Sequence, residues 1–222
     1  QKKSRRQPQK AFFCHRLSNP LQRNSTIHRG RQLGLRPGFS SRYPDRSLFF
    51  FNRKPRIPLP QSLTILRTID EARAFIHAQK QVTLQRRIGI VPTMGALHLG
   101  HLSLIDRARS ECDCVVTTIY VNPTQFGPNE DLESYPRTLE SDLEMLALHG
   151  CDAVFVPENV TMYPSGFSTV VTAPAVANEL EGVFRPTHFD GVCTVVLKLF
   201  NILHATDAYF GLKDFQQFVV LR

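Results

Sequence analysis

The sequence predicts an α/β protein with a Rossmann-like parallel sheet and helices on both faces. Short runs rich in valine and isoleucine, such as 88–91 and 115–121, alternate with segments whose apolar residues recur at helical spacing. Loops with unusual polar residues follow strands at 92–101, 122–129 and 211–217. Because the strands of a parallel sheet end at one edge, these loops are expected to meet there and form a ligand site.

Charge divides the 222-residue chain into two predicted parts. Residues 1–60 hold 15 basic residues and one acid, a net charge of +14, whereas residues 61–222 hold 12 basic and 18 acidic residues, a net charge of −6. Scattered arginine, proline and glycine without a sustained apolar period predict that 1–60 is a disordered extension. Four interpretations stay open: an organelle transit peptide, an arm that binds nucleic acid or another anionic surface, an extension without function, or sequence foreign to the natural protein.

The composition excludes several classes of protein. No apolar run approaches the roughly 20 residues of a membrane-spanning helix. The five cysteines are odd in number and form no CxxC pair, so neither a disulfide framework nor a zinc site is predicted. Reduced thiols typical of a cytoplasmic protein are expected at Cys14, Cys112, Cys114, Cys151 and Cys193.

The elements of residues 61–222 follow from apolar periodicity and from end signals. Thr68 and Glu71 match a capping box, so a helix is expected over 69–79. Gly150 ends a helix predicted over 137–149. The other elements are a short extended entry at 64–66, helices over 99–110, 190–203 and from 215 onward, strands at 153–156 and 208–210, and an irregular segment at 157–190.

Residues 91–101, VPTMGALHLGH, are predicted to bind a nucleotide triphosphate. Their pattern indicates the end of a buried strand, a tight turn and the start of a helix. The first backbone N–H groups of a helix lack partners, and the helix dipole places partial positive charge there. His98 and His101 would add N–H donors, and Gly100 lets a ligand approach the backbone. Two histidines at this spacing are also typical of surface residues, core residues or half of a metal site.

Two further loops carry candidate binding residues. Asn122 and Gln125 follow the strand at 115–121, and their carboxamides suit a polar substrate with hydroxyls and a carboxylate. A polar turn whose amides are satisfied internally is the alternative. Arg185 and His188 lie just before a predicted helix and indicate a loop that contacts an anion.

Several segments, taken in order, resemble one enzyme family. The segments are PTMGALHLGH, VNPTQFGPNEDL, YPRTLE, RPTHFDGV, and YFG followed by KD and QQ. Together they resemble the pantothenate synthetases, or pantoate–β-alanine ligases, of the HIGH-motif nucleotidyltransferase superfamily. The likeness covers 63–222. It implies the HIGH-type nucleotidyltransferase fold, a homodimer, and ATP-dependent condensation of (R)-pantoate with β-alanine through a pantoyl-adenylate, releasing pyrophosphate and AMP. Mg²⁺ is expected to accompany ATP.

The resemblance also implies roles for residues of this sequence. His98 and His101 would contact the triphosphate, with His101 as the proton donor, and Lys213 would neutralise phosphate charge. The implied ATP-binding residues are Met94, Gly95, Ala96, Leu97, His98, Leu99, Gly100, His101, Gly211, Leu212, Lys213 and Asp214. The implied substrate-side residues are Asn122, Gln125 and Gln217, with Arg185 and His188 as phosphate-side or supporting groups.

The sequence departs from the family pattern in two ways. Where the family usually has Gly-Glu-Lys-Asp, this chain has Leu212, which matters if a carboxylate there orients Lys213. The family pattern also continues beyond Arg222 with a serine-rich loop and a small C-terminal lobe. We therefore expect an incomplete copy that lacks this lobe, folds in large part and is poorly competent as a ligase.

Two other functions compete with this interpretation. Another HIGH-type adenylyltransferase with a different acceptor is disfavoured by the VNPTQF and RPTHF segments. A nucleic-acid-binding protein would use the basic 1–60 segment, and its affinity would fall steeply with salt. The acidic 61–222 region lacks the interleaved basic and aromatic residues that would support that function.

Overall fold

The structure is a computed structural model that describes residues 14–18, 62–83, 85–128, 130 and 132–222. These described residues belong to one compact unit. The predicted disordered extension falls mostly outside the described residues and stays a prediction.

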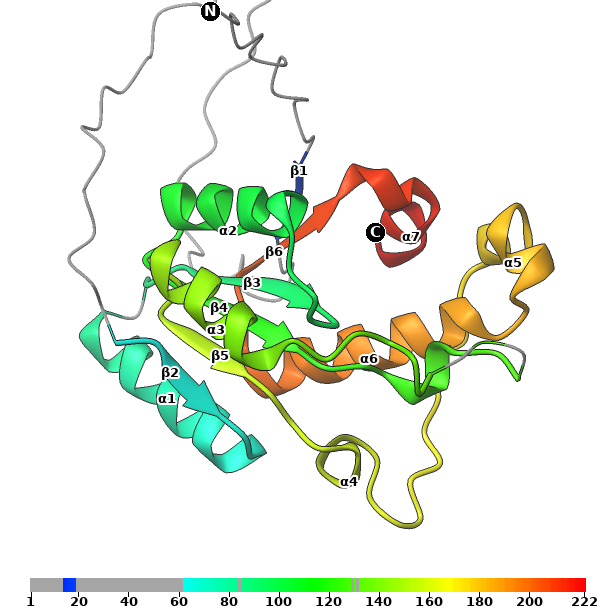
Figure 1. Cartoon of the computed structure of the whole chain (residues 1–222), viewed down its shortest axis with the longest axis horizontal. Helices are drawn as coiled ribbons and strands as arrows, with labels where there is room; N and C mark the ends of the chain where they lie inside the picture. The colour runs from blue at the N-terminus through cyan, green and yellow to red at the C-terminus, as the bar shows by residue number, and fades with distance from the viewer. Residues whose placement is uncertain (1–13, 19–61, 84, 129, 131) are drawn as a thin grey trace, which may run out of the picture. The chain divides into compact units, whose positions relative to one another are not determined.

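A six-stranded sheet forms the centre of this unit (Figure 1). Its strands are β1 (Cys14–Ser18), β2 (Thr64–Leu66), β3 (Ile88–Thr93), β4 (Cys114–Ile119), β5 (Ala153–Phe155) and β6 (Asp207–Gly211). The spatial order is β1-β6-β3-β4-β5-β2. The pairs from β6 to β2 are parallel, which confirms the predicted parallel sheet. β1 pairs antiparallel with β6, and no pattern in the sequence predicts this strand.

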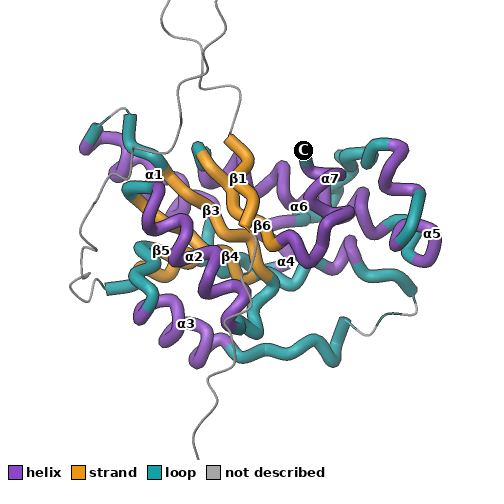
Figure 2. The backbone as a smooth tube through the Cα atoms, turned by 90° about the horizontal axis from the view of Figure 1, so that it is seen from above, coloured by secondary structure: helices purple, strands orange, loops and turns teal. Residues whose placement is uncertain are grey.

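Helices cover both faces of the sheet, as predicted. α1 (Ile69–Val82) and α6 (His188–Leu203) pack on one face, and α2 (Leu99–Glu111) and α3 (Leu139–Leu148) pack on the other. Figure 2 shows the strands at the centre with the helices around them. Alternate residues of one strand serve the two faces, since Ile88 and Ile90 pack with α1 and α6 whereas Val91 packs with α2 and α3. A strand buried on both faces therefore has the continuous apolar run seen in the sequence.

Most predicted elements are present, with their ends shifted by a few residues. The capping box of α1 is formed, because Glu71 N–H donates to Thr68 Oγ1 and Thr68 N–H donates to the Glu71 carboxylate. The segment 157–190, predicted to be irregular, contains α4 (Asn159–Met162), η3 (Ala175–Asn178) and α5 (Glu181–Phe184). These turns are too short to leave a helical period in the sequence. The remaining elements are η2 (Pro123–Gln125), η4 (Leu212–Asp214) and α7 (Phe215–Leu221).

Across the described residues, no helix has both the length and the apolar character needed to span a membrane. Cys112, Cys114, Cys151 and Cys193 are buried thiols, and burial raises the pKa of the Cys151 thiol to about 11. That thiol is therefore protonated and poorly nucleophilic at neutral pH.

Candidate active site

A cavity of about 670 Å³ lies at the carboxyl ends of β3, β4 and β6. The loops that follow these three strands all contribute to its wall, as the sequence predicts, and α6 supplies an apolar side. Tyr120 and Tyr135 also line it and were not predicted. The predicted residues that line the cavity are Met94, His98, Gly100, His101, Asn122, Gln125, Gly211, Leu212, Lys213, Asp214 and Gln217. Gly95, Ala96, Leu97, Leu99, Arg185 and His188 do not line it.

The turn between β3 and α2 is held by a buried carboxylate from α3. Gly95 and Ala96 have φ angles of 88° and 51°, in the left-handed region that a residue with a side chain rarely adopts. The N–H groups of Ala96 and Leu97 donate to the Asp142 carboxylate at 2.9 and 2.8 Å. Ala96 and Leu97 are among the residues that the family resemblance implies to bind ATP, and their N–H groups are paired with Asp142 in this structure. Asp142 is only 1% exposed, and nothing in the sequence pattern marks it as part of the site.

The two histidines stand at the start of α2 with their rings 4.1 Å apart. His98 is the N-cap, and its Nδ1 accepts the Gly100 N–H at 3.0 Å, so neutral His98 carries its proton on Nε2. Burial, and next the neighbouring His98, lower the pKa of His101 to about 4. His101 is therefore neutral at pH 7, and among the described residues its buried Nδ1 has no hydrogen-bond partner.

The loop after β6 brings one cation to the cavity. Lys213 is 89% exposed at its side chain and pairs with the adjacent Asp214, whose carboxylate raises the pKa of Lys213. An exposed pair of this kind contributes little stability, so Lys213 can turn toward a ligand at small cost. Leu212 presents an aliphatic side chain to the same wall.

Asn122 and Gln125 form one amide pair at the end of β4. Asn122 is 1% exposed, and its Nδ2 donates to Gln125 Oε1 at 3.1 Å and to the Gly191 carbonyl at 3.2 Å. Gln125 Nε2 lies 3.3 Å from the Met94 sulfur, a weak acceptor. Asn122 therefore orients Gln125, and Gln125 keeps donor capacity for a ligand.

Arg185 and His188 hold the main chain at Gln125 from outside the cavity. The Arg185 guanidinium makes two contacts with the Glu130 carboxylate and one with Glu181, and these carboxylates raise the pKa of Arg185. Arg185 Nη1 donates to His188 Nε2 at 3.1 Å, so neutral His188 donates from Nδ1 to the Gln125 carbonyl, 2.9 Å away. This pair was expected on the phosphate side or in a supporting position, and these contacts favour the supporting position, because the acidic partners already pair with the guanidinium.

Gly191 allows α6 to approach this loop closely. A β-carbon at position 191 would lie 2.4 Å from the Thr124 carbonyl oxygen and 2.7 Å from the Gln125 nitrogen. The backbone of α6 therefore packs directly against η2, which carries the Gln125 side chain.

Comparison with known proteins gives a consistent result. The family model described as pantoate-beta-alanine ligase matches residues 64–222. A pantothenate synthetase of Chromohalobacter salexigens is 54% identical over 159 residues, which are 71% of this chain and 56% of that protein. One of Deinococcus radiodurans is 56% identical over 144 residues, 65% of this chain and 51% of that protein. The chain thus spans about half the length of these relatives.

Solved structures agree with these matches. The crystal structure of pantothenate synthetase from Thermus thermophilus has a TM-score of 0.67 and 45% identity, covering 72% of this chain and 56% of that one. A pantoate-beta-alanine ligase from Francisella tularensis, complexed with beta-gamma ATP and beta-alanine, has a TM-score of 0.65 and 39% identity, covering 72% of this chain and 60% of that one. Because the family model matches residues 64–222, which are most of this chain, the chain belongs to the pantoate–β-alanine ligase family.

Proposed function

We propose that this protein takes part in the ATP-dependent joining of (R)-pantoate to β-alanine, which gives pantothenate, AMP and pyrophosphate. The observation that carries the proposal is that the segments expected, from the resemblance, to bind the nucleotide and the substrate line one cavity at the start of α2. The cavity volume of about 670 Å³ lies in the range of small-molecule sites. Membership of the family supports the choice of substrates.

The reaction requires activation of a carboxylate, which is a poor electrophile. Attack of the pantoate carboxylate on the α-phosphate of ATP forms a pantoyl-adenylate and releases pyrophosphate, and the β-alanine amine then displaces AMP. We assign the phosphates to the start of α2, where His98 Nε2–H and the helix dipole favour negative charge. Lys213 would stabilise charge on the leaving pyrophosphate. His101 is neutral in the free protein, so it would act as a hydrogen-bond donor before any proton transfer.

We assign the hydroxy acid to the wall formed by Gln125 and Gln217. Gln125 offers its Nε2 donors, since its oxygen is occupied by Asn122. The apolar side of the cavity, formed by Val192, Val195, Val196 and Leu199 of α6, suits the branched carbon skeleton of pantoate. A donor facing an apolar wall matches an acid that carries oxygens at its ends and methyl groups between them.

Mg²⁺ fits this site as a companion of ATP. No cluster of three or more His, Cys, Asp or Glu side chains suited to a metal occurs in the described part of the chain. Mg²⁺ commonly binds through substrate phosphates, waters and one or two carboxylates, and Asp214 is a carboxylate in the cavity wall. Bound there, the ion would neutralise phosphate charge. We further propose, from family membership and the buried thiols, a homodimeric cytoplasmic enzyme.

ATP–pyrophosphate exchange tests the proposal with β-alanine omitted. We expect label from pyrophosphate to enter ATP only when (R)-pantoate is present, and His101→Ala to remove the exchange. His149→Ala serves as the matched control, since His149 follows α3 and pairs with Asp106 away from the cavity. A folded chain that binds neither ATP nor pantoate would contradict the proposal.

A further inference from the structure

Backbone groups fix the orientation of the Asn122 carboxamide. The Gly191 carbonyl can only accept, so the Asn122 atom 3.2 Å away is the Nδ2 donor. The Thr124 N–H can only donate, and it points to the opposite Asn122 atom, Oδ1, at 3.4 Å. The two constraints agree and leave one orientation of this amide.

That orientation determines which end of Gln125 is available to a ligand. Asn122 Nδ2 donates to the Gln125 atom 3.1 Å away, which must therefore be Oε1. Gln125 Nε2 is left on the side of Met94, in the cavity wall. The amide pair thus presents an N–H donor to the cavity.

Tyr163 lies at the far end of this chain of hydrogen bonds. Its hydroxyl is 2.9 Å from Asn122 Oδ1, which can only accept, so the tyrosine donates. Burial raises the pKa of this phenol, which keeps it protonated at neutral pH. Tyr163 follows α4 and does not line the cavity.

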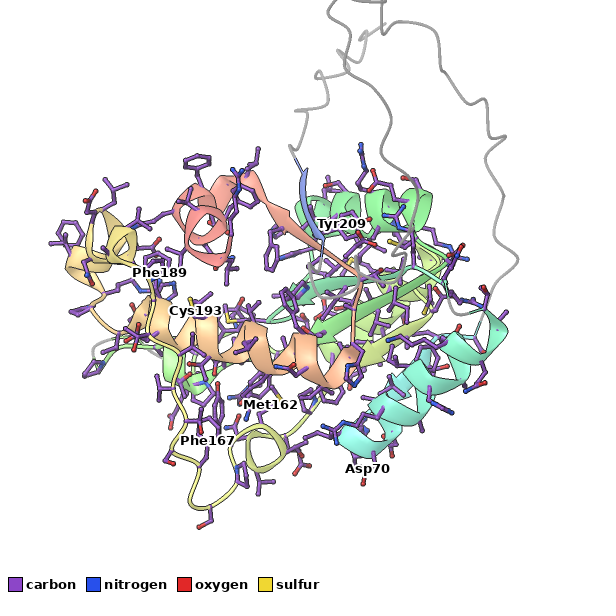
Figure 3. All side chains as sticks on the ribbon, turned by 180° about the vertical axis from the view of Figure 1, so that it is seen from behind. Asp70, Met162, Phe167, Phe189, Cys193 and Tyr209 are labelled. Carbon is purple, nitrogen blue, oxygen red and sulfur yellow. The ribbon has the colours of Figure 1, made fainter. Side chains whose placement is uncertain are left out.

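The ring of Tyr163 is held in place by neighbours that do not touch its hydroxyl. Phe167 packs edge-on with ring centroids 5.0 Å apart, and the Lys198 ammonium lies 4.1 Å from the Phe167 centroid and 5.3 Å from that of Tyr163. Figure 3 shows Phe167 on the segment that follows α4, on the α6 side of the molecule. The hydroxyl is therefore directed at Asn122 by packing as well as by hydrogen bonding.

We infer that Tyr163 is a positioning residue for the hydroxy-acid site. It donates to Asn122, Asn122 donates to Gln125, and Gln125 then donates to an oxygen of the bound acid. This assignment rests on the proposed function. It also specifies the chemistry of the cavity wall at Gln125, which binds a carboxylate or hydroxyl oxygen and disfavours a group that can only donate.

A double-mutant cycle tests this chain of contacts. Binding of (R)-pantoate is measured by calorimetry on the full chain saturated with α,β-methylene ATP, which cannot transfer its adenylyl group to pantoate. Tyr163→Phe keeps the ring and removes the hydroxyl, and we expect affinity to fall about three- to ten-fold. Gln125→Ala removes the contact with the acid. In that background Tyr163→Phe should cause no further loss, because the two residues act in series.

Two controls separate positioning from a general loss of structure. His77→Gln changes an exposed side chain of α1 away from the cavity and should leave pantoate affinity unchanged. Binding of the ATP analogue should be equal in all variants.

Either of two results would overturn this inference alone. One is an unchanged pantoate affinity in Tyr163→Phe. The other is that Tyr163→Phe lowers the affinity equally in the unchanged chain and in the Gln125→Ala background. Absence of pantoate binding to the unchanged chain would overturn the proposed function, and the inference with it.

Discussion

The carboxylate of Asp142 on α3 lies 2.8 Å from the backbone nitrogen of Leu97, which precedes it by 45 residues. The same carboxylate accepts from the neighbouring Ala96 N–H and from the Thr138 hydroxyl. Two successive N–H groups aimed at one buried carboxylate fix a turn that contains two left-handed residues. The position of the start of α2 therefore depends on a side chain from another helix.

Replacing Asp142 should destabilise the protein and weaken nucleotide binding together. Asp142→Asn leaves an amide that can accept at only one of its two ends, so one of the two N–H groups loses its partner. We expect a loss of about 2 kcal/mol in the free energy of unfolding, measured by urea titration. Asp106→Asn is the matched control, because Asp106 is an exposed acid that pairs with His149. Equal free energies of unfolding in the two variants would show that the buried contacts of Asp142 stabilise the protein no more than the exposed pair of Asp106 does.

The pH dependence of stability should report the burial of His101. Its pKa is about 4 in the folded protein, against about 6.5 when unfolded, so between these values the unfolded chain binds the extra proton. Stability should therefore rise with pH from 4 to 6.5. We expect the free energy of unfolding to rise by about 2 kcal/mol over this window. This is less than the full pKa shift of His101 would give, because the ring is partly exposed. Urea titrations of His101→Gln should show a flatter profile, whereas the exposed His77→Gln should retain the slope.

Leu212 should limit the adenylation step. With the family's usual glutamate restored by Leu212→Glu, Lys213 would gain a second carboxylate beside Asp214 and spend more time at the cavity wall. We expect pantoate-dependent exchange to rise about two- to five-fold, the range of an exposed ion pair. Leu212→Gln has similar size without the charge, and a rise of the same extent in that variant would argue against an electrostatic cause.

Arg185 should affect the acid site more than the nucleotide site. Arg185→Lys keeps the charge but loses the forked contact with Glu130 and the support of the Gln125 carbonyl. We expect pantoate affinity to fall about ten-fold. Affinity for the ATP analogue should stay within about two-fold of the unchanged chain. Arg107→Lys, which alters a surface pair with Glu111, is the control. A larger loss of nucleotide binding would instead place Arg185 on the phosphate side.

The parts of the fold that local patterns control could be predicted from the sequence. The runs at 88–91 and 115–121 are β3 and β4 because their residues face two packed layers, and an apolar run signals that directly. The meeting of the polar loops followed from the parallel sheet itself. These inferences needed no knowledge of which side chains touch.

Other features depend on contacts between distant residues, which local patterns do not encode. Asp142 lies in a helix whose sequence resembles any exposed acidic helix, and only the fold brings it to Leu97. Arg185 indicates an anion site by its charge, but Glu130 and Glu181 are the anions it meets. β1 has the sequence CHRLS, which shows no apolar alternation, and its partner β6 lies far along the chain.

That N-terminal strand has a consequence for processing of the chain. β6 pairs with β3 only at Asp207 and Ala208, whereas β1 pairs with it along its whole length to Gly211. The end of β6 that leads to Lys213 is therefore anchored in the sheet by β1. Proteolytic removal of residues 1–13 would leave this anchor in place. Cleavage after Ser18 would release it, and those amides between Tyr209 and Gly211 that point toward β1 would then exchange their hydrogens with solvent faster.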